Sequence, residues 1–193
     1  MLAPNWRSLA KQVRRVPERV AHPWRRRSAV RRLAGTPPPW SILFVCHGNI
    51  CRSPYAAAVA RRELPPTVTV ASAGFIGMDR PSPPEAVATA AERGSDLIPH
   101  RSRPISRDAL RDSTLIIVMD AEQRRRLLSA EWTVTLPVIL LGDLDPEPIT
   151  ERTIPDPVDQ PVGAFRSCYE RIDRCMGTLI GLWREHADNQ AHG

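Results

Sequence analysis

The chain has 193 residues, 42% hydrophobic and 25% charged, which is typical of one globular domain rather than two. No apolar run approaches the roughly 18 to 20 residues that a transmembrane helix requires, and no signal-peptide core opens the chain. Four cysteines are too few for a disulfide scaffold, so we expect a reducing compartment and a cytoplasmic location.

The net charge of +6 is unevenly distributed. Residues 1–40 carry +9, which leaves −3 for residues 41–193. A nucleic-acid-binding domain would spread its basic residues over the folded surface, so we expect no nucleic acid partner.

Residues 1–39 form a basic extension rich in proline and arginine, and three consecutive prolines mark its end. This composition buries little apolar surface and favours disorder. Apolar residues nevertheless recur there at helical spacing, namely Trp6, Leu9, Ala10, Val13 and Val16. The extension is therefore expected to be disordered or partly an amphipathic helix, which would suit contact with a membrane surface or a partner. An organelle transit peptide is the other reading of such an arginine-rich start.

From residue 41 short β-branched runs alternate with longer amphipathic stretches, as in a parallel sheet with crossover helices. Strands are expected at 42–46, 68–71, 115–119 and 138–141. Helices are expected at 54–63, 84–93, 106–111, 121–128 and 162–186. The pattern predicts one α/β domain over residues 40–188, with a doubly wound four-stranded parallel sheet flanked by helices. Residues 189–193 are expected to be a frayed C-terminus.

The first predicted strand runs directly into the sequence C-H-G-N-I-C-R-S-P at residues 46–54. A loop containing Gly48 can turn successive amides toward one tetrahedral anion, and the first turn of the next helix adds its unpaired amides. Arg52 can grip two oxygens of a phosphoryl group. A Cys46 thiol in such a setting loses its proton easily and becomes a nucleophile. This pattern predicts a phosphate-binding loop and phosphoryl transfer to sulfur.

These residues resemble the low-molecular-weight protein tyrosine phosphatase family, whose loop reads C-x-G-N-x-C-R-S-P after the first strand. The resemblance continues at Ser72-Ala73-Gly74, His100-x-x-Arg103, Met119-Asp120 and Asp156-Pro157. It implies a cysteine-dependent phosphomonoester hydrolase with a phosphocysteine intermediate and with neither metal nor organic cofactor.

The resemblance also implies residue roles. Asp156, which lies 110 residues after Cys46, would be the general acid. Without the resemblance, several neighbouring carboxylates would be equal candidates, namely Asp143, Asp145, Glu147, Glu151 and Asp159. The loop itself would comprise His47, Gly48, Asn49, Ile50, Cys51, Arg52 and Ser53. Its hydrogen-bonding support would come from Asn49, Ser53, Ser72 and His100. His47 is read as a solvent-facing neighbour of the nucleophile, and Asp120 as either a site residue or a helix cap.

The family also pairs its second loop cysteine with the nucleophile in a protective disulfide, a role implied here for Cys51. The alternative is a small buried residue that only packs. Cys168 and Cys175 lie seven residues apart on the last predicted helix and are expected in its apolar stripe.

Phosphotyrosine-selective relatives often place aromatic residues after the acid, where this chain has Val158, and after the second strand, where Met78 or a neighbour would form the wall. We therefore expect phosphatase chemistry with weaker stacking on a phenyl ring. By resemblance, the partner would be a phosphotyrosine protein such as a bacterial tyrosine kinase in a polysaccharide-export system. A thioredoxin-coupled arsenate reductase and a phosphate-binding regulatory module recruited by the basic extension remain alternatives.

Overall fold

The computed structural model describes the backbone of residues 6–38, 40–129, 131–132 and 134–191, and side chains between residues 18 and 188 within those ranges. The strands are β1 (Ser41–Cys46), β2 (Thr69–Gly74), β3 (Leu115–Val118) and β4 (Val138–Leu140). The α-helices are α1 (Trp6–Ala34), α2 (Arg52–Glu63), α3 (Pro84–Ala91), α4 (Arg107–Arg111), α5 (Ala121–Leu127) and α6 (Val162–Ala191). A short 3-10 helix, η1 (Leu141–Leu144), follows β4.

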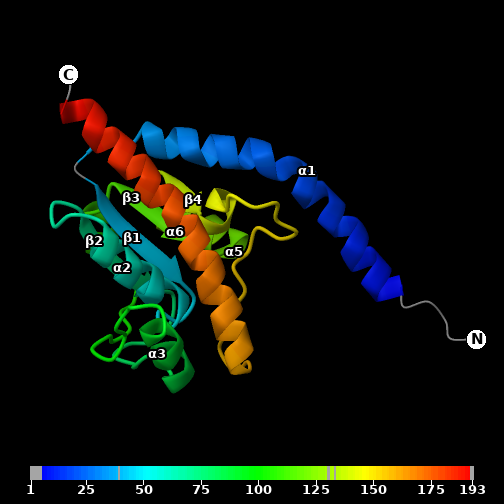
Figure 1. The fold of residues 1–193 in the computed structure, drawn as a ribbon. Coiled ribbons are helices and arrows are strands. Elements are labelled where there is room, and N and C mark those ends of the chain that lie inside the picture. Colours follow the sequence, from blue (N-terminus) through cyan, green and yellow to red (C-terminus); the bar gives the residue numbers. More distant parts are fainter. Residues whose placement is uncertain (1–5, 39, 130, 133, 192–193) are drawn as a thin grey trace, which may run out of the picture.

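Within the described residues the strands form one sheet in the order β2-β1-β3-β4, and every neighbouring pair is parallel (Figure 1). This confirms the predicted fold class. The order reverses beside β1, so the loop after β1 opens at the edge where sheets of this type bind ligands.

Alternating side chains of the central strands fill two cores, because successive residues of a strand point to opposite faces. Phe44 on β1 and Ile117 on β3 belong to the core covered by α2, α6 and part of α1. Val45 and Ile116 belong to the smaller core, which Leu110 and Leu127 cover from α4 and α5. Both faces of the sheet are thus buried, which explains why β1 and β3 read as continuous apolar runs.

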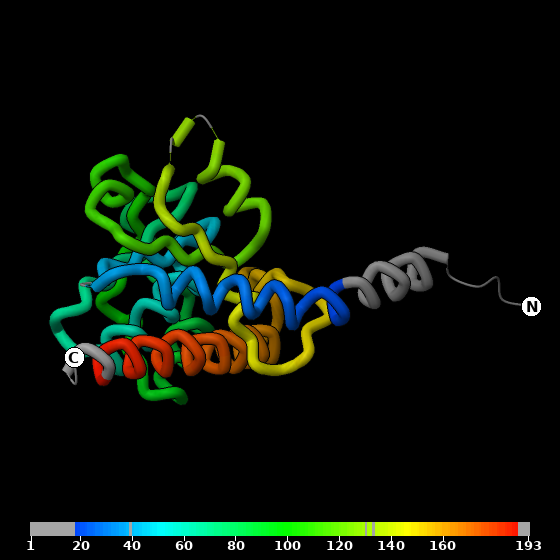
Figure 2. The backbone as a smooth tube through the Cα atoms, turned by 90° about the horizontal axis from the view of Figure 1, so that it is seen from above, coloured from blue at the N-terminus to red at the C-terminus, as the bar shows by residue number. Residues whose placement is uncertain are grey.

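The basic extension, for which disorder and a partial amphipathic helix were the two expectations, is helical over most of its length and forms the single helix α1. The C-terminal part of this helix packs on the domain: Ala29 and Leu33 are 5% and 0% exposed and belong to the larger core. His22 is buried as well and contacts the backbone oxygen of Asp145 at 2.9 Å through Nε2. Figure 2 shows α1 running beside α6. The change in composition near residue 40 therefore does not separate α1 from the hydrophobic core of the domain.

Helix α6 continues five residues beyond the expected end at 186. The expected frayed terminus falls partly on this helix, while residues 192–193 lie outside the described residues. None of the described helices has the length and apolarity that crossing a membrane requires.

Candidate active site

Cys46 ends β1, and the loop that follows curls back over its sulfur before α2 begins at Arg52. The amide of Asn49 donates to Sγ at 3.2 Å, and the hydroxyl of Ser53 lies 3.0 Å from Sγ. Cys46 and Ser53 are 2% and 0% exposed. Two hydrogen-bond donors can therefore stabilise negative charge on this sulfur at the N-terminus of a helix.

Asn49 holds the loop in shape. Its φ of 51° is in the left-handed region, which asparagine tolerates better than most residues. Its Nδ2 donates to Ser53 Oγ at 2.9 Å and to Ser72 Oγ at 3.0 Å, and its Oδ1 accepts from the amide of Arg103 at 2.9 Å. His100 donates from Nε2 to the backbone oxygen of Asn49 at 2.7 Å. The structure thus brings the expected support residues into one hydrogen-bond network around Asn49.

Gly74 lets the end of β2 approach this loop. A Cβ at this position would lie 2.8 Å from the amide nitrogen of Asn49 and 2.9 Å from the oxygen of His47, closer than side chains pack. The same oxygen of His47 accepts from the amides of Phe75 and Ile76 at 2.8 and 3.1 Å. The His47 side chain is exposed. The structure therefore places His47 at the surface of the loop, as the solvent-facing reading expected.

Arg52 points from the first turn of α2 into the site and is 3% exposed. Its Nη1 donates to the oxygen of Ile154 at 3.1 Å, and its Nη2 forms an ion pair with Asp156. Nη1 also lies 3.8 Å from the carboxylate of Asp120, which in addition caps α5 by accepting from the amide of Gln123. Asp120 therefore caps α5 and also lies beside Arg52. The Nε of Arg52 is buried without a hydrogen-bond partner among the described residues.

A pocket of about 90 Å³ opens over the loop. Its lining includes Cys46, His47, Gly48, Ile50, Cys51, Arg52, Ile76, Arg80, Asp156 and Val158. Its apolar wall is formed by Ile76 and Val158. The wall expected from Met78 or a neighbour is thus supplied by the neighbour Ile76, whereas Met78 itself is 75% exposed and does not line the pocket. An adjacent hollow of about 310 Å³ is lined in part by Phe75. The guanidinium carbon of Arg126 lies 4.4 Å from the centroid of the Phe75 ring.

Arg80 and Arg126 are site residues that the sequence did not indicate. Arg80 reaches the oxygen of Gly48 at 3.1 Å from a segment 32 positions away. Neither arginine belongs to a recognisable motif, because only the folded chain brings Arg80 to the pocket and Arg126 to the adjacent hollow.

The comparisons with known proteins agree with this geometry. The family model described as low molecular weight phosphotyrosine protein phosphatase matches residues 41–190. The chain belongs to this family. A probable low molecular weight protein-tyrosine-phosphatase EpsP from Ralstonia nicotianae is 36% identical over 141 residues, which cover 72% of this chain and 93% of the relative. The low molecular weight protein-tyrosine-phosphatase Etp of Escherichia coli K12 is 33% identical, with 69% and 88% covered.

Among solved structures, the Erwinia amylovora tyrosine phosphatase AmsI aligns with a TM-score of 0.66 at 30% identity and covers 73% of this chain and 91% of its own. An arginine phosphatase, YwlE from Geobacillus stearothermophilus, aligns with a TM-score of 0.70 at 24% identity over 80% and 98% of the two chains, which supports the shared fold only. Helix α1 precedes the part of this low molecular weight phosphatase that the family model matches.

The other cysteines of this low molecular weight phosphatase are buried thiols. Burial raises the pKa of Cys51 far above its ordinary range, and the charge of Asp156 adds to the shift. Burial also raises the pKa of Cys168 to about 12 and that of Cys175 further still. Cys168 and Cys175 lie in the larger core, as expected, and their protonated thiols are poorly suited to thiol exchange.

Two stacked tyrosines support the loop from below. The rings of Tyr55 and Tyr169 are stacked and nearly parallel, with an interplanar angle of 3° and ring centroids 3.8 Å apart. Tyr169 donates its hydroxyl to the oxygen of Cys51 at 3.3 Å, and Tyr55 donates to Asp173 at 2.7 Å. Through Tyr169, helix α6 therefore helps to fix the position of the loop relative to the core.

Proposed function

We propose that this chain is a protein tyrosine phosphatase that hydrolyses phosphomonoesters through Cys46, Arg52 and Asp156. The observation that carries the proposal is the buried Arg52 beside Cys46, with an Nε that lacks a partner among the described residues. A buried donor without an acceptor is costly, and a phosphoryl oxygen would supply the acceptor. Family membership supports the same reaction.

In the first half-reaction the Cys46 thiolate attacks phosphorus, and the bond between phosphorus and the ester oxygen breaks. The electron pair of that bond goes to the leaving oxygen, which takes a proton from Asp156. Loop amides and Arg52 bind the charge on the equatorial oxygens of the phosphoryl group. The position of Asp156 against Arg52 supports this role, because the acid then lies beside the transferred group.

In the second half-reaction water attacks the phosphocysteine. The Asp156 carboxylate now takes a proton from this water, the bond between sulfur and phosphorus breaks, and its electron pair returns to Cys46 as thiolate. Phosphate is released. The donors at Cys46 Sγ, from Asn49 and Ser53, make the sulfur a better leaving group by stabilising its charge.

The test is hydrolysis of para-nitrophenyl phosphate by freshly reduced protein with chelator present. We expect turnover by the wild type, none by Cys46→Ser, and a loss of roughly 10²- to 10⁴-fold in Asp156→Ala. Arg52→Lys should also fail despite its charge, because a lysine cannot bind two oxygens in one plane. Full activity of Cys46→Ser would refute the mechanism.

For the substrate we propose a tyrosine-phosphorylated protein, such as a bacterial tyrosine kinase, in a cytoplasmic setting where Cys46 stays reduced. The named relatives, which are protein-tyrosine-phosphatases, support this class. The pocket wall of Ile76 and Val158 offers apolar contact to a phenyl ring without aromatic stacking. Comparing phosphotyrosine with phosphoserine peptides of equal sequence tests the preference, and equal rates would remove it.

We also propose that Cys51 protects the nucleophile. After oxidation of Cys46 to a sulfenic acid, the Cys51 thiol would displace water and form a disulfide. Because burial raises the pKa of Cys51, we expect its thiol to react slowly with the sulfenic acid. Peroxide followed by thiol should restore the wild type but not Cys51→Ala, and equal recovery of both would exclude this role.

The outer side of α1 supports a membrane-surface contact. Val20 and Trp24 are 58% and 63% exposed. Arg27 and Arg31 are exposed as well, and positions 20, 24, 27 and 31 follow one another at helical spacing. Cosedimentation with acidic but not with neutral vesicles would support the contact, and Trp24→Ala should weaken it. No binding to acidic vesicles would exclude it.

A further inference from the structure

The segment between η1 and α6 carries Asp156, and a side chain of α6 holds it in place. Arg171 donates from Nη1 to the oxygen of Thr153 at 2.7 Å and from Nη2 to the oxygen of Glu151 at 2.5 Å. These two carbonyls lie three and five positions before Asp156. One planar guanidinium therefore fixes the backbone that leads to the proposed acid.

Arg171 is itself anchored by a buried carboxylate. Its Nε donates to Asp145 Oδ2 at 3.2 Å, and the side chains of Arg171 and Asp145 are 14% and 0% exposed. Arg174, one turn further along α6, also binds Asp145 through Nε and Nη2, both at 3.2 Å. Among the described residues Asp145 thus has two arginine partners. Arg174 also pairs with the side chain of Glu147 at 3.4 Å, but of the two arginines only Arg171 binds backbone carbonyls of the segment that leads to Asp156.

Other contacts leave this segment little room to shift. A Cβ at Gly142 would lie 2.0 Å from the oxygen of Arg152, so η1 packs directly on the segment. Ile154 donates its amide to the oxygen of Met119 at 2.9 Å and accepts from Arg52. The backbone is therefore held from η1, from the end of β3, from Arg52 and from Arg171.

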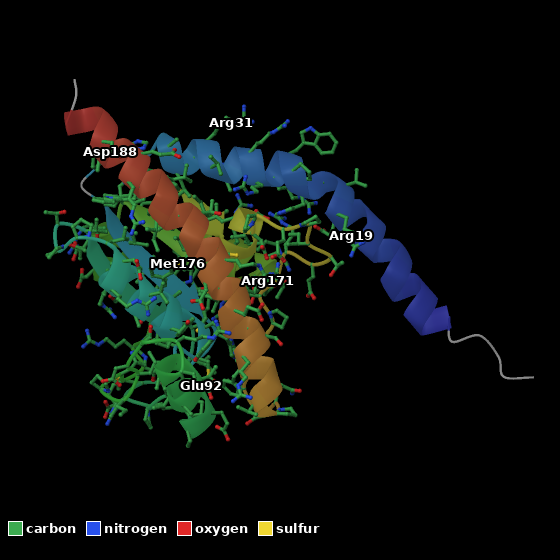
Figure 3. All side chains as sticks on the ribbon, viewed as in Figure 1. Arg19, Arg31, Glu92, Arg171, Met176 and Asp188 are labelled. Atoms are coloured by element: carbon green, nitrogen blue, oxygen red, sulfur yellow. The ribbon has the colours of Figure 1, made fainter. Side chains whose placement is uncertain are left out.

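We propose that Arg171 is a positioning residue for Asp156: its bonds to Glu151 and Thr153, anchored by Asp145, set where the acid stands over the leaving oxygen. The inference rests on the proposed function of Asp156. Figure 3 shows Arg171 on the side of α6 that faces the segment between η1 and α6. Arg171 does not line the pocket over the loop and acts only through this backbone.

The role has a chemical signature that a purely structural role lacks. A leaving group that is a strongly acidic phenol departs without a proton, whereas an ordinary phenol needs one from the acid. Asp156 also acts in the second half-reaction, which both esters share, so the comparison uses kcat/KM, which reports the first half-reaction only. Misplacing Asp156 should lower kcat/KM for phenyl phosphate and leave kcat/KM for 2,4-dinitrophenyl phosphate nearly unchanged. General destabilisation of the fold would lower both rates together.

The experiment compares Arg171→Gln with Arg174→Gln on both substrates. Both changes remove one partner of Asp145, but only Arg171→Gln frees the carbonyls of Glu151 and Thr153. We expect Arg171→Gln to lose about 10- to 100-fold in kcat/KM on phenyl phosphate, which is part of the full general-acid effect. On the dinitrophenyl ester kcat/KM should fall less than about threefold. The ratio of the two rates in Arg174→Gln should stay at the wild-type value.

Arg171→Lys provides a second variant if Arg171→Gln fails to fold. It keeps a charge beside Asp145 but cannot bind both carbonyls in one plane, so the same change in the ratio is expected. An unchanged ratio in the Arg171 variants, with a normal effect of Asp156→Ala, overturns the positioning role alone. An unchanged ratio in Asp156→Ala instead refutes the proposed acid.

Discussion

The network around Asn49 allows a quantitative prediction. The Asn49 side chain is fully buried and forms three hydrogen bonds with described residues, to Ser53, Ser72 and Arg103. At a net value of about 0.5–1.5 kcal/mol each, their loss in Asn49→Ala costs roughly 2–4 kcal/mol. Alanine at a φ of 51° adds about 1 kcal/mol. We therefore expect the free energy of unfolding to fall by about 3–5 kcal/mol.

A double-mutant cycle isolates one bond of this network. Ser72→Ala alone should cost about 0.5–1.5 kcal/mol, because the hydroxyl of Ser72 loses its bond from Asn49. In the background of Asn49→Ala that bond is already gone, so Ser72→Ala should then cost almost nothing. The expected coupling energy is about 1 kcal/mol, within the range for residues in one network.

Urea unfolding followed by circular dichroism measures all four free energies. Ser167→Ala is the matched control, because its exposed hydroxyl bonds to the oxygen of Gly163 and shares no described partner with Asn49. Its cost should be the same with and without Asn49→Ala. If Ser72→Ala and Asn49→Ala are as additive as the control pair, Asn49 does not organise the loop through Ser72.

Three further predictions concern the loop, the pH dependence and α1. Gly74→Ala should destabilise the fold by about 1–3 kcal/mol and lower kcat, because its methyl group would collide with the backbone of Asn49. A wild-type free energy of unfolding together with a wild-type kcat would refute the close approach of β2 to the loop. Burial is the main cause that lowers the pKa of His100 in the folded chain. At pH values between this lowered pKa and the value of about 6.5 in the unfolded chain, the unfolded chain binds more protons than the folded one. Stability should therefore fall as pH drops below about 6.5, less steeply in His100→Gln, and equal slopes in urea titrations would contradict this. Leu33→Ala should lower the free energy of unfolding by about 2–5 kcal/mol, and the control Val20→Ala, at an exposed position, by less than about 0.5 kcal/mol. Equally small losses in both variants would mean that α1 is not part of the core.

The sheet could be predicted from the sequence because its strands are buried on both faces. The expected strands at 42–46 and 115–119 differ from β1 and β3 by one residue at one end. Helix α1 was harder to predict, because Pro23 and the arginine runs argue against a helix locally. What stabilises it is distant: Leu33 packs in the core and His22 reaches Asp145, 123 positions away. Such contacts leave no periodic signal in the sequence.

The residues of the candidate site also differ in how far the sequence could predict them. Cys46 and Arg52 lie in one contiguous motif, so local sequence was enough to nominate them. Asp156 needed the family resemblance, because spacing alone does not separate it from the carboxylates around it. Arg80 and Arg171 could not be nominated at all. Each donates a hydrogen bond to a backbone carbonyl of another segment, which lies close to the arginine only in the folded chain.

The association of α1 with the domain has two physical components that respond differently to salt. The extension is strongly basic and the rest of the chain is slightly acidic, so a long-range attraction exists, but ions screen it beyond about 8 Å at physiological ionic strength. The burial of Ala29 and Leu33 and the bond from His22 act at contact distance and are screened little. Packing rather than charge therefore fixes α1 on the domain.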